Sequence, residues 1–357
     1  MRAGQFGILH AVDPILPDHV LQRRHERRAE ARARQRRRRL RQLAIAAFVA
    51  GLAVLGLLAA SLGGGGGRGG EHQASAAGRG GLRAHAARVP VRYGLRPPPR
   101  GLHVVVDLGR PPRSGLLFNL DNGELLWSRD PTAVVPIASL TKMMTALLVV
   151  GNTEPDADDP VLVKHAAMAY QGSGIGLLKL GMRVGVETML YGLLLPSGND
   201  AAIALAQHVG GTVPRFVAMM NREARLMHLT CTHYVAPDGF IDRDNHSCAV
   251  DLAVLARDML RQPRLARIVR SRSAVEPFPI KGGKLYLYNN NPLLRIGYPG
   301  TIGVKTGYTQ LAGHCLVAAA ERHGVRLGVV LLNTPTVPGT GPQAETLLDA
   351  GFRAYGV

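Results

Sequence analysis

The chain has 357 residues, a formal net charge of +18 and three cysteines. This length suffices for one large or two modest domains, and three cysteines exclude a small disulfide-built scaffold. Residues 1–100 carry 19 Arg against 5 acids, whereas residues 101–357 carry 24 Lys and Arg against 20 acids. The excess positive charge therefore belongs to an N-terminal arm and says little about what the globular part binds.

The first hundred residues predict a membrane anchor and a tether. Residues 1–41 contain a dense run of arginines, and residues 42–62 follow without a single charged side chain. About 20 apolar residues are enough to cross a bilayer, and arginines beside such a span hold that end in the cytoplasm. We therefore expect a single-pass protein of the cell membrane with a basic cytoplasmic tail, a transmembrane helix over 42–62 and an extracytoplasmic remainder.

A cleaved signal peptide is the alternative for this span. Such a peptide has a shorter apolar core with an A-x-A site close behind it, whereas Ala74-Ser75-Ala76 lies about a dozen residues further on. Nucleic-acid binding is an alternative for the arginines, but the adjoining apolar span argues against it. Residues 63–100, rich in Gly and Pro, are expected to form a disordered linker before a globular domain over 101–357.

The globular part begins with a predicted hairpin, in which two apolar runs flank Asp121-Asn122-Gly123. The middle of the domain is expected to be helical, over 139–150, 187–195, 199–209 and 213–227. Its end is expected to return to strands and close with a helix, over 300–306, 313–320, 325–332 and 343–355. Strands near both ends with helices between them predict an α+β domain with one antiparallel sheet flanked by helices.

The first chemical motif is Ser139-Leu-Thr-Lys142 at the start of the first expected helix. Its spacing places a hydroxyl and an amine on one helix face. A serine becomes a nucleophile beside a base, and a lysine serves as that base when it is held neutral. Burial in an apolar helix and a second cation such as Lys305 would favour the neutral form of Lys142. The alternatives are a Ser139 that only caps the helix and a Lys142 that extends to solvent.

The second motif, Ser197-Gly-Asn199, stands at another helix start. Ser197 can pass a proton between Lys142 and a leaving amine. The amide of Asn199 can bind a peptide carbonyl and orient Lys142. Ordinary capping is the alternative for both side chains.

The third motif, Lys305-Thr-Gly307, follows a strand pattern. Gly307 has no side chain, so a substrate backbone can lie along that edge. Lys305 and Thr306 offer a charge and a hydroxyl to a terminal carboxylate. The backbone N–H of Tyr308 pairs naturally with that of Ser139 as an oxyanion hole. An ordinary strand end is the alternative.

The three motifs in this order are the signature of penicillin-binding proteins and class A β-lactamases. More narrowly, residues 116–355 resemble the low-molecular-mass D-alanyl-D-alanine carboxypeptidases of serine peptidase family S11. The resemblance rests on extended blocks around the motifs, namely 136–145, 197–202, 303–309 and 312–316. It implies a β-lactamase/transpeptidase-like fold, with a five-stranded antiparallel sheet flanked by helices and a mostly helical subdomain.

The resemblance also implies a function for the domain over 101–357. A serine carboxypeptidase of this kind trims peptidoglycan stem peptides ending in D-Ala-D-Ala through an acyl-enzyme at Ser139, binds β-lactam antibiotics and needs no metal or cofactor. A DD-endopeptidase or β-lactamase on the same scaffold stays open, as does a catalytically inert wall-binding protein. Pro237-Asp-Gly239 stands where the family has a His-Gly segment. No Glu-x-x-x-Asn base follows Asn199, so fast hydrolysis of a β-lactam acyl-enzyme is not expected.

The cysteines form a symmetric pattern with histidines, Cys231-Thr-His233 and His246-Ser-Cys248. One intervening residue is poor spacing for a tetrahedral zinc site. A disulfide between Cys231 and Cys248 fits an extracytoplasmic domain better and would contribute about 3 kcal/mol. Cys315 lies in an expected strand and is predicted to be a small buried apolar residue.

Overall fold

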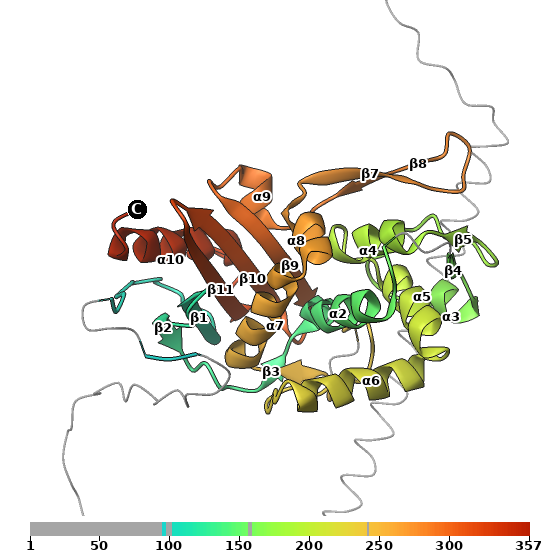
Figure 1. Cartoon of the computed structure of the whole chain (residues 1–357). Coiled ribbons are helices and arrows are strands. Elements are labelled where there is room, and N and C mark those ends of the chain that lie inside the picture. The colour runs from blue at the N-terminus through green and yellow to red at the C-terminus, as the bar shows by residue number, and fades with distance from the viewer. Residues whose placement is uncertain (1–94, 98–101, 156–158, 241–242) are drawn as a thin grey trace, which may run out of the picture. The chain divides into compact units, whose positions relative to one another are not determined.

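The computed structural model in Figure 1 describes residues 95–97, 102–155, 159–240 and 243–357. The predicted cytoplasmic tail, the apolar span over 42–62 and nearly all of the predicted linker lie outside these ranges. Within them, no helix is both long and apolar enough to span a bilayer.

One antiparallel sheet of five strands joins the two ends of the domain. The hairpin predicted around Asn122-Gly123 is confirmed, and its first strand pairs with a strand from the C-terminal part, in the order β2-β1-β11-β10-β9. The strands are β1 (Ser114–Asn119), β2 (Leu125–Arg129), β9 (Thr301–Thr309), β10 (Gly313–Arg322) and β11 (Val325–Thr334). β9 is therefore an edge strand, and one side of its backbone is open to other partners.

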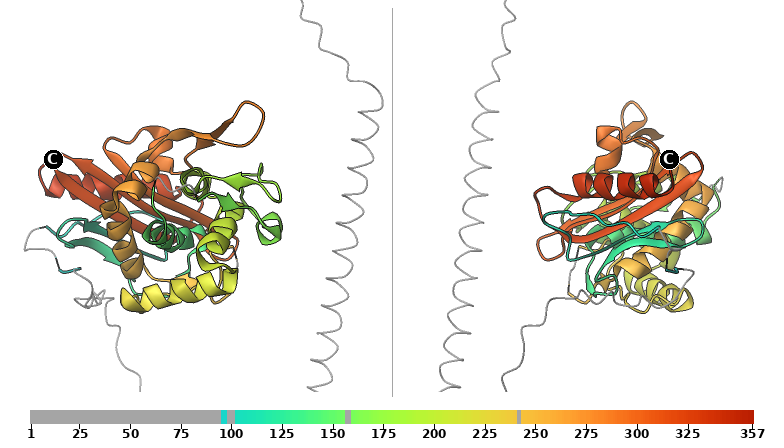
Figure 2. Two further views of the ribbon diagram at one scale, coloured as in Figure 1. Left: turned by 45° about the vertical axis from the view of Figure 1, so that its right-hand side comes forward. Right: turned by 90° about the vertical axis from the view of Figure 1, so that its left-hand side faces the viewer.

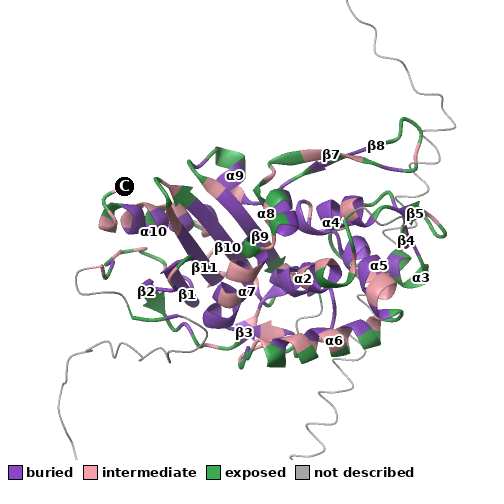
Figure 3. Cartoon of the chain, in the orientation of Figure 1, coloured by how far each residue is buried: buried purple, intermediate pink, exposed green. Residues whose placement is uncertain are grey.

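Both faces of the sheet are covered, as the alternation of buried side chains requires. On β10, Leu316 and Ala318 join a core with Leu347 and Phe352 of α10 (Thr340–Ala354). Their neighbour Val317 faces the opposite core, which contains most of the other helices, whereas Leu293 belongs to the core of α10. The right-hand view of Figure 2 shows α10, in red, lying across one face of the sheet, and Figure 3 shows the buried strands between the layers.

The helical part lies between β2 and β9 in the chain. The helices are η1 (Ala138–Thr141), α2 (Lys142–Asn152), α3 (His165–Met168), α4 (Val186–Leu194), α5 (Asn199–Gly210), α6 (Val213–Leu226), α7 (Ala249–Arg261), α8 (Pro263–Arg270) and α9 (Pro292–Ile296). Three two-stranded pairs accompany them: β3 (Val135–Pro136) with β6 (His246–Ser247), β4 (Val161–Leu162) with β5 (Arg183–Val184), and β7 (Ser273–Pro277) with β8 (Lys284–Tyr288).

Two of the predicted boundaries that were wrong lie in the motifs. The helix expected to begin at Ser139 starts with the 3₁₀ turn η1, and Lys142 is the first residue of α2. A 3₁₀ turn has three residues per turn, so side chains three apart lie one above the other, and Lys142 still stands over Ser139. The strand expected to end at Thr306 continues to Thr309, so the third motif lies inside β9.

Candidate active site

A cavity of about 680 Å³ collects residues of all three motifs. Six of the eight residues predicted for catalysis and substrate binding line it: Ser139, Ser197, Asn199, Thr306, Gly307 and Tyr308. The other two, Lys142 and Lys305, are 0% and 1% exposed and are not among its lining residues. The fold thus brings together segments that are more than 160 residues apart in the chain.

The amine of Lys142 has three polar neighbours. Its Nζ lies 2.9 Å from Ser139 Oγ, 2.6 Å from Asn199 Oδ1 and 2.7 Å from the backbone oxygen of Asp238. A neutral amine has two hydrogens and one lone pair. Because the amide and backbone oxygens can only accept, they take the two hydrogens. The lone pair is then left for the hydroxyl of Ser139, which is the arrangement a general base requires.

Burial also favours the neutral amine. Removal from water lowers the pKa of Lys142 from 10.5 to about 7, while the carboxylates of Asp238 and Asp200 act in the opposite direction. Lys305 was expected to be the nearby cation that helps. Its own pKa is lowered well below the ordinary value, by burial first and by the charge of Lys142 second. Desolvation therefore dominates at both amines.

Ser197 and Asn199 stand on either side of the start of α5. Asn199 is its first residue, and its Nδ2 donates to the backbone oxygen of Gln171 while its Oδ1 faces Lys142. Ser197 has φ +67, a conformation uncommon outside glycine. Its hydroxyl is buried and has no hydrogen-bond partner among the described residues. A buried hydroxyl on the wall of a cavity with its bonding capacity unused is suited to a ligand.

The backbone of β9 passes close to η1 at Gly307. A Cβ added there would lie 3.0 Å from the oxygen of Ile137 and 3.1 Å from the nitrogen of Ser139, which explains why glycine stands at this position. Lys305 Nζ donates to the backbone oxygen of Thr306 at 2.9 Å, beneath the cavity wall. Thr306 therefore lines the cavity, and the buried amine of Lys305 lies against the backbone of Thr306.

The loop around Asp238, which lies outside the three motifs, supplies one of the hydrogen-bond acceptors of Lys142. Besides the bond from Lys142 to Asp238, Thr145 Oγ1 donates to the oxygen of Pro237 at 2.6 Å. Gly239 has φ +73, and a Cβ there would collide with the oxygen of Ala138. The sequence reasoning noted this segment only as a departure from the family pattern. The turn-forming pair Asp-Gly was the available signal, but it does not reveal which backbone oxygen faces the lysine.

Aromatic side chains border the cavity. No role for these rings was predicted from the sequence. Phe240 is 39% exposed, and Tyr308 is 61% exposed with its ring 4.6 Å from that of His314. Both Phe240 and His314 belong to the cavity lining.

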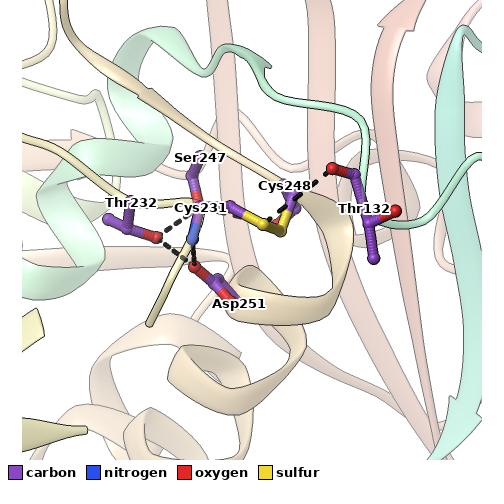
Figure 4. Close-up of a disulfide and its surroundings, with 6 residues drawn as sticks. All are labelled: Thr132, Cys231, Thr232, Ser247, Cys248 and Asp251. Carbon is purple, nitrogen blue, oxygen red and sulfur yellow. Dashed lines mark hydrogen bonds between the residues drawn. A yellow bond between two sulfur atoms is a disulfide. The ribbon is translucent and has the colours of Figure 1, made fainter. Parts of the chain in front are cut away.

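Cys231 and Cys248 form a disulfide with a Cα–Cα distance of 5.6 Å (Figure 4). Asp251 supports it, because its Oδ2 accepts from the nitrogen of Cys231 at 2.8 Å and from Thr232 Oγ1 at 2.7 Å. The two sulfur atoms are bonded to each other, so they do not offer thiolates to a metal. The loop that the disulfide closes contains Asp238, the carbonyl partner of Lys142.

Comparison with known proteins gives consistent matches over this domain. The family model for D-alanyl-D-alanine carboxypeptidase, peptidase family S11, matches residues 112–336. D-alanyl-D-alanine carboxypeptidase DacF of Bacillus subtilis is 31% identical over 254 residues, which cover 70% of this chain and 64% of DacF. DacB2 of Mycobacterium tuberculosis is 36% identical over 248 residues, which cover 68% of this chain and 82% of DacB2.

Solved structures match as well. The Streptomyces K15 DD-transpeptidase is 29% identical with a TM-score of 0.63, and the match covers 70% of this chain and all of that one. A D-alanyl-D-alanine carboxypeptidase from Mycobacterium tuberculosis H37Rv is 34% identical with a TM-score of 0.65, covering 72% of this chain and 96% of that one. Against several curated relatives, among them DacF and the DacA and DacD proteins of Escherichia coli, the chain spans only 61–64% of their length.

Proposed function

Since the chain belongs to the D-alanyl-D-alanine carboxypeptidase family S11, we propose that it is a serine-type D-Ala-D-Ala carboxypeptidase that trims peptidoglycan stem peptides through an acyl-enzyme at Ser139. One observation carries this proposal above the others. The Nζ of Lys142 lies between two acceptors, Asn199 Oδ1 and the Asp238 oxygen, and the hydroxyl of Ser139. That geometry aims a lone pair at the nucleophile.

Acylation follows from this arrangement. Lys142 takes the proton of Ser139 while Ser139 Oγ attacks the carbonyl carbon between the two D-alanines. Negative charge then develops on the carbonyl oxygen, and the backbone N–H groups of Ser139 and Tyr308 are the donors that would stabilise it. The C–N bond breaks, an ester forms at Ser139, and the departing amine needs one proton. The hydroxyl of Ser197, which has no hydrogen-bond partner in the described part of the chain, is suited to relay that proton from Lys142.

The terminal carboxylate of the substrate is assigned to Thr306 and Lys305. Burial holds the pKa of Lys305 well below its ordinary value. An incoming carboxylate is an opposite charge, which raises that pKa and favours the ammonium form. The substrate would thus recruit the positive charge that binds it, with the hydroxyl of Thr306 as the direct contact. Hydrolysis of the ester by water completes the cycle.

β-Lactams would acylate the same serine. A β-lactamase is disfavoured because fast release of the drug needs an additional base. Glu187, the nearest acid upstream of the second motif, is engaged by Arg264 at 2.7 Å and Arg267 at 2.6 Å and is not among the cavity residues. An inert wall-binding protein is disfavoured because the nucleophile, base and relay are all present.

We further propose that the domain works outside the cytoplasm, anchored by residues 42–62 with the basic tail over 1–41 inside. The uncharged apolar run directly after the arginines supports this, and so does the disulfide, since such bonds persist in oxidising compartments. No nucleic acid is expected as a partner. Loss of membrane recovery when 42–62 is deleted is the expected result, and unchanged recovery would contradict the anchor.

The direct test combines covalent labelling with turnover. Full-length protein is incubated with a labelled penicillin and digested, and mass spectrometry locates the adduct. The expected adduct is on Ser139, with release of free D-alanine from a pentapeptide ending in D-Ala-D-Ala. An adduct on another residue, or no D-alanine release by a protein that is labelled at Ser139, would contradict the proposed reaction.

A further inference from the structure

The β7–β8 hairpin exposes one face that includes two tyrosines. Along β8, Leu285 and Leu287 are 3% and 4% exposed, whereas Tyr286 and Tyr288 are 61% and 69% exposed. The buried leucines face the helical core, and Thr188 Oγ1 of α4 donates to the oxygen of Pro277 at the end of β7. The hairpin is therefore held from its inner side, and its outer face presents aromatic rings to solvent. Figure 1 shows the hairpin beside α4, and Figure 3 shows exposed stretches along it.

This outer face continues into the active-site cavity. After Tyr288 the alternation goes on through Asn289, which is buried, to Asn290, which is exposed and lines the cavity. The nitrogen of Asn289 donates to the oxygen of Arg272 at 3.0 Å, so pairing with the neighbouring segment extends past the strand. Residues two apart in a strand share a face. Tyr286, Tyr288 and Asn290 thus form one row, which we call the tyrosine track.

The track reaches the cavity beside Ser197. Asn290 donates from its nitrogen to the oxygen of Leu195 at 3.1 Å and from Nδ2 to the oxygen of Pro196 at 3.1 Å. Ser197 is the next residue. In the proposed function, on which this inference rests, Ser197 protonates the amine that leaves, and Thr306 holds the carboxylate beside that amine. The track therefore starts on the amine side of the scissile bond.

The acyl side lies in the other direction. The oxyanion donor Tyr308 follows Thr306 along β9, so the stem peptide that becomes the acyl group extends past Tyr308 and away from the carboxylate site. A departing D-alanine is a single residue and ends at that site. Tyr288 and Tyr286 lie about 7 and 13 Å further along the strand than Asn290, at about 3.3 Å per residue. A free D-alanine has no atoms to place there.

We propose that the tyrosine track binds the amine-side strand of a cross-linked wall peptide, so that the enzyme also cleaves cross-links as a DD-endopeptidase. The chemistry is that of the proposed carboxypeptidase. Ser139 Oγ forms an ester with the acyl strand, and the C–N bond of the cross-link breaks. The second strand departs as the amine with the proton that Lys142 supplies through Ser197, and water hydrolyses the ester. No additional reactant is needed.

The hairpin and the segments that flank it are basic, and Lys284 shares the exposed face of β8 with Tyr286 and Tyr288. Residues 270–300 contain five cations against the single acid Glu276: Arg270, Arg272, Lys281, Lys284 and Arg295. Stem peptides carry carboxylates, and exposed tyrosines offer apolar ring faces with a polar edge, as is usual at binding surfaces. An anionic membrane surface would suit the same chemistry. Because Asn290 connects the tyrosine track to the active-site cavity, a peptide substrate is favoured over a membrane surface as the occupant.

The test compares two substrates with full-length protein and the double variant Tyr286→Ala/Tyr288→Ala. On a monomeric pentapeptide, D-alanine release is expected to be unchanged. On a purified cross-linked dimer, kcat/KM for cleavage into monomers is expected to fall about tenfold, from the loss of two aromatic contacts. Tyr286→Phe/Tyr288→Phe keeps the ring faces and should retain dimer cleavage. Leu226→Ala, at a side chain 62% exposed at the end of α6, is the matched surface control.

Several outcomes would overturn the inference. Dimers left uncut by the unaltered protein, or cut equally well by the double alanine variant, would refute the track, while D-alanine release would still uphold the proposed function. Equal losses on both substrates would show that the tyrosines do not distinguish the amine side. Loss of sedimentation with anionic vesicles, with dimer cleavage intact, would assign the surface to the membrane. If the unaltered protein releases no D-alanine, the proposed function itself fails.

Discussion

The buried amine of Lys142 predicts how acylation depends on pH. Only the neutral amine can take the proton of Ser139, and burial lowers its pKa from 10.5 to about 7. At pH 7 about half of the molecules then carry the active base, whereas a lysine with the ordinary pKa would be neutral in about 0.03% of them. A pKa lowered this far corresponds to about 5 kcal/mol of disfavoured charge on the amine. Burial thus raises the active fraction about a thousandfold.

The assay is the second-order rate constant for acylation by a fluorescent penicillin, measured by stopped flow between pH 5 and 9. Because the base is active when deprotonated, the rate is expected to rise about tenfold per pH unit below the pKa and to level off above about pH 7. Asp238→Asn supplies a matched perturbation. It removes a carboxylate that raises the pKa of Lys142 and keeps the backbone oxygen that accepts from the amine. The midpoint should move to lower pH.

The reasoning would be refuted by a rate that keeps rising tenfold per unit through pH 9, since that is the behaviour of a lysine with an ordinary pKa. A midpoint that moves to higher pH in Asp238→Asn would show that the carboxylate does not act on the amine as inferred. Circular dichroism of the variant at both ends of the pH range controls for loss of the fold.

Three further changes test separate parts of the structure. Ser139→Ala should abolish the penicillin adduct and lower D-alanine release at least about 10³-fold at an unchanged melting temperature, as measured by mass spectrometry, kinetics and calorimetry. Replacing Cys231 and Cys248 by alanine removes a closure of 17 residues, so urea unfolding should report a loss of about 3 kcal/mol. Gly307→Ala would crowd the backbone of η1 and slow acylation about tenfold. Gly151→Ala, which meets open space, should leave the rate unchanged.

Local patterns predicted the elements well where one face of the element is buried. The turn at Asn122-Gly123 and the helices near 187–195, 199–209 and 213–227 follow from signals that neighbouring residues carry. The predicted proximity of Ser139 and Lys142 is confirmed although the predicted helix boundary was wrong. A spacing of three places both side chains on one side of an α-helix and of a 3₁₀ helix. Five-strand pairing across the whole domain was implied by the resemblance to a known family, and local patterns alone did not give it.

The β7–β8 hairpin was missed for a reason within its own sequence. Lys284-Leu-Tyr-Leu-Tyr288 alternates strictly between exposed and buried positions. Leucine and tyrosine both count as apolar, so the alternation is hidden when residues are sorted only by hydrophobicity. The second hydrogen-bond acceptor for Lys142 was missed for another reason. Every residue has a backbone carbonyl, so only the path of the chain decides that the one at Asp238 faces the amine.

The path of the chain around Asp238 links the geometry of the active site to the disulfide, and so to an oxidising compartment. Asp238 lies within the loop closed by Cys231 and Cys248, and the loop also packs on η1 through Gly239. If this loop moves, Lys142 loses an acceptor for one of its two hydrogens, and its lone pair is no longer directed at Ser139 by its surroundings. Burial, opposed by the carboxylates of Asp238 and Asp200, sets how often the amine is neutral, whereas the loop also sets where the lone pair points. Reduction of the disulfide should therefore slow acylation. If it also moves the carboxylate of Asp238 away from the amine, the midpoint of the pH profile should fall, as in Asp238→Asn.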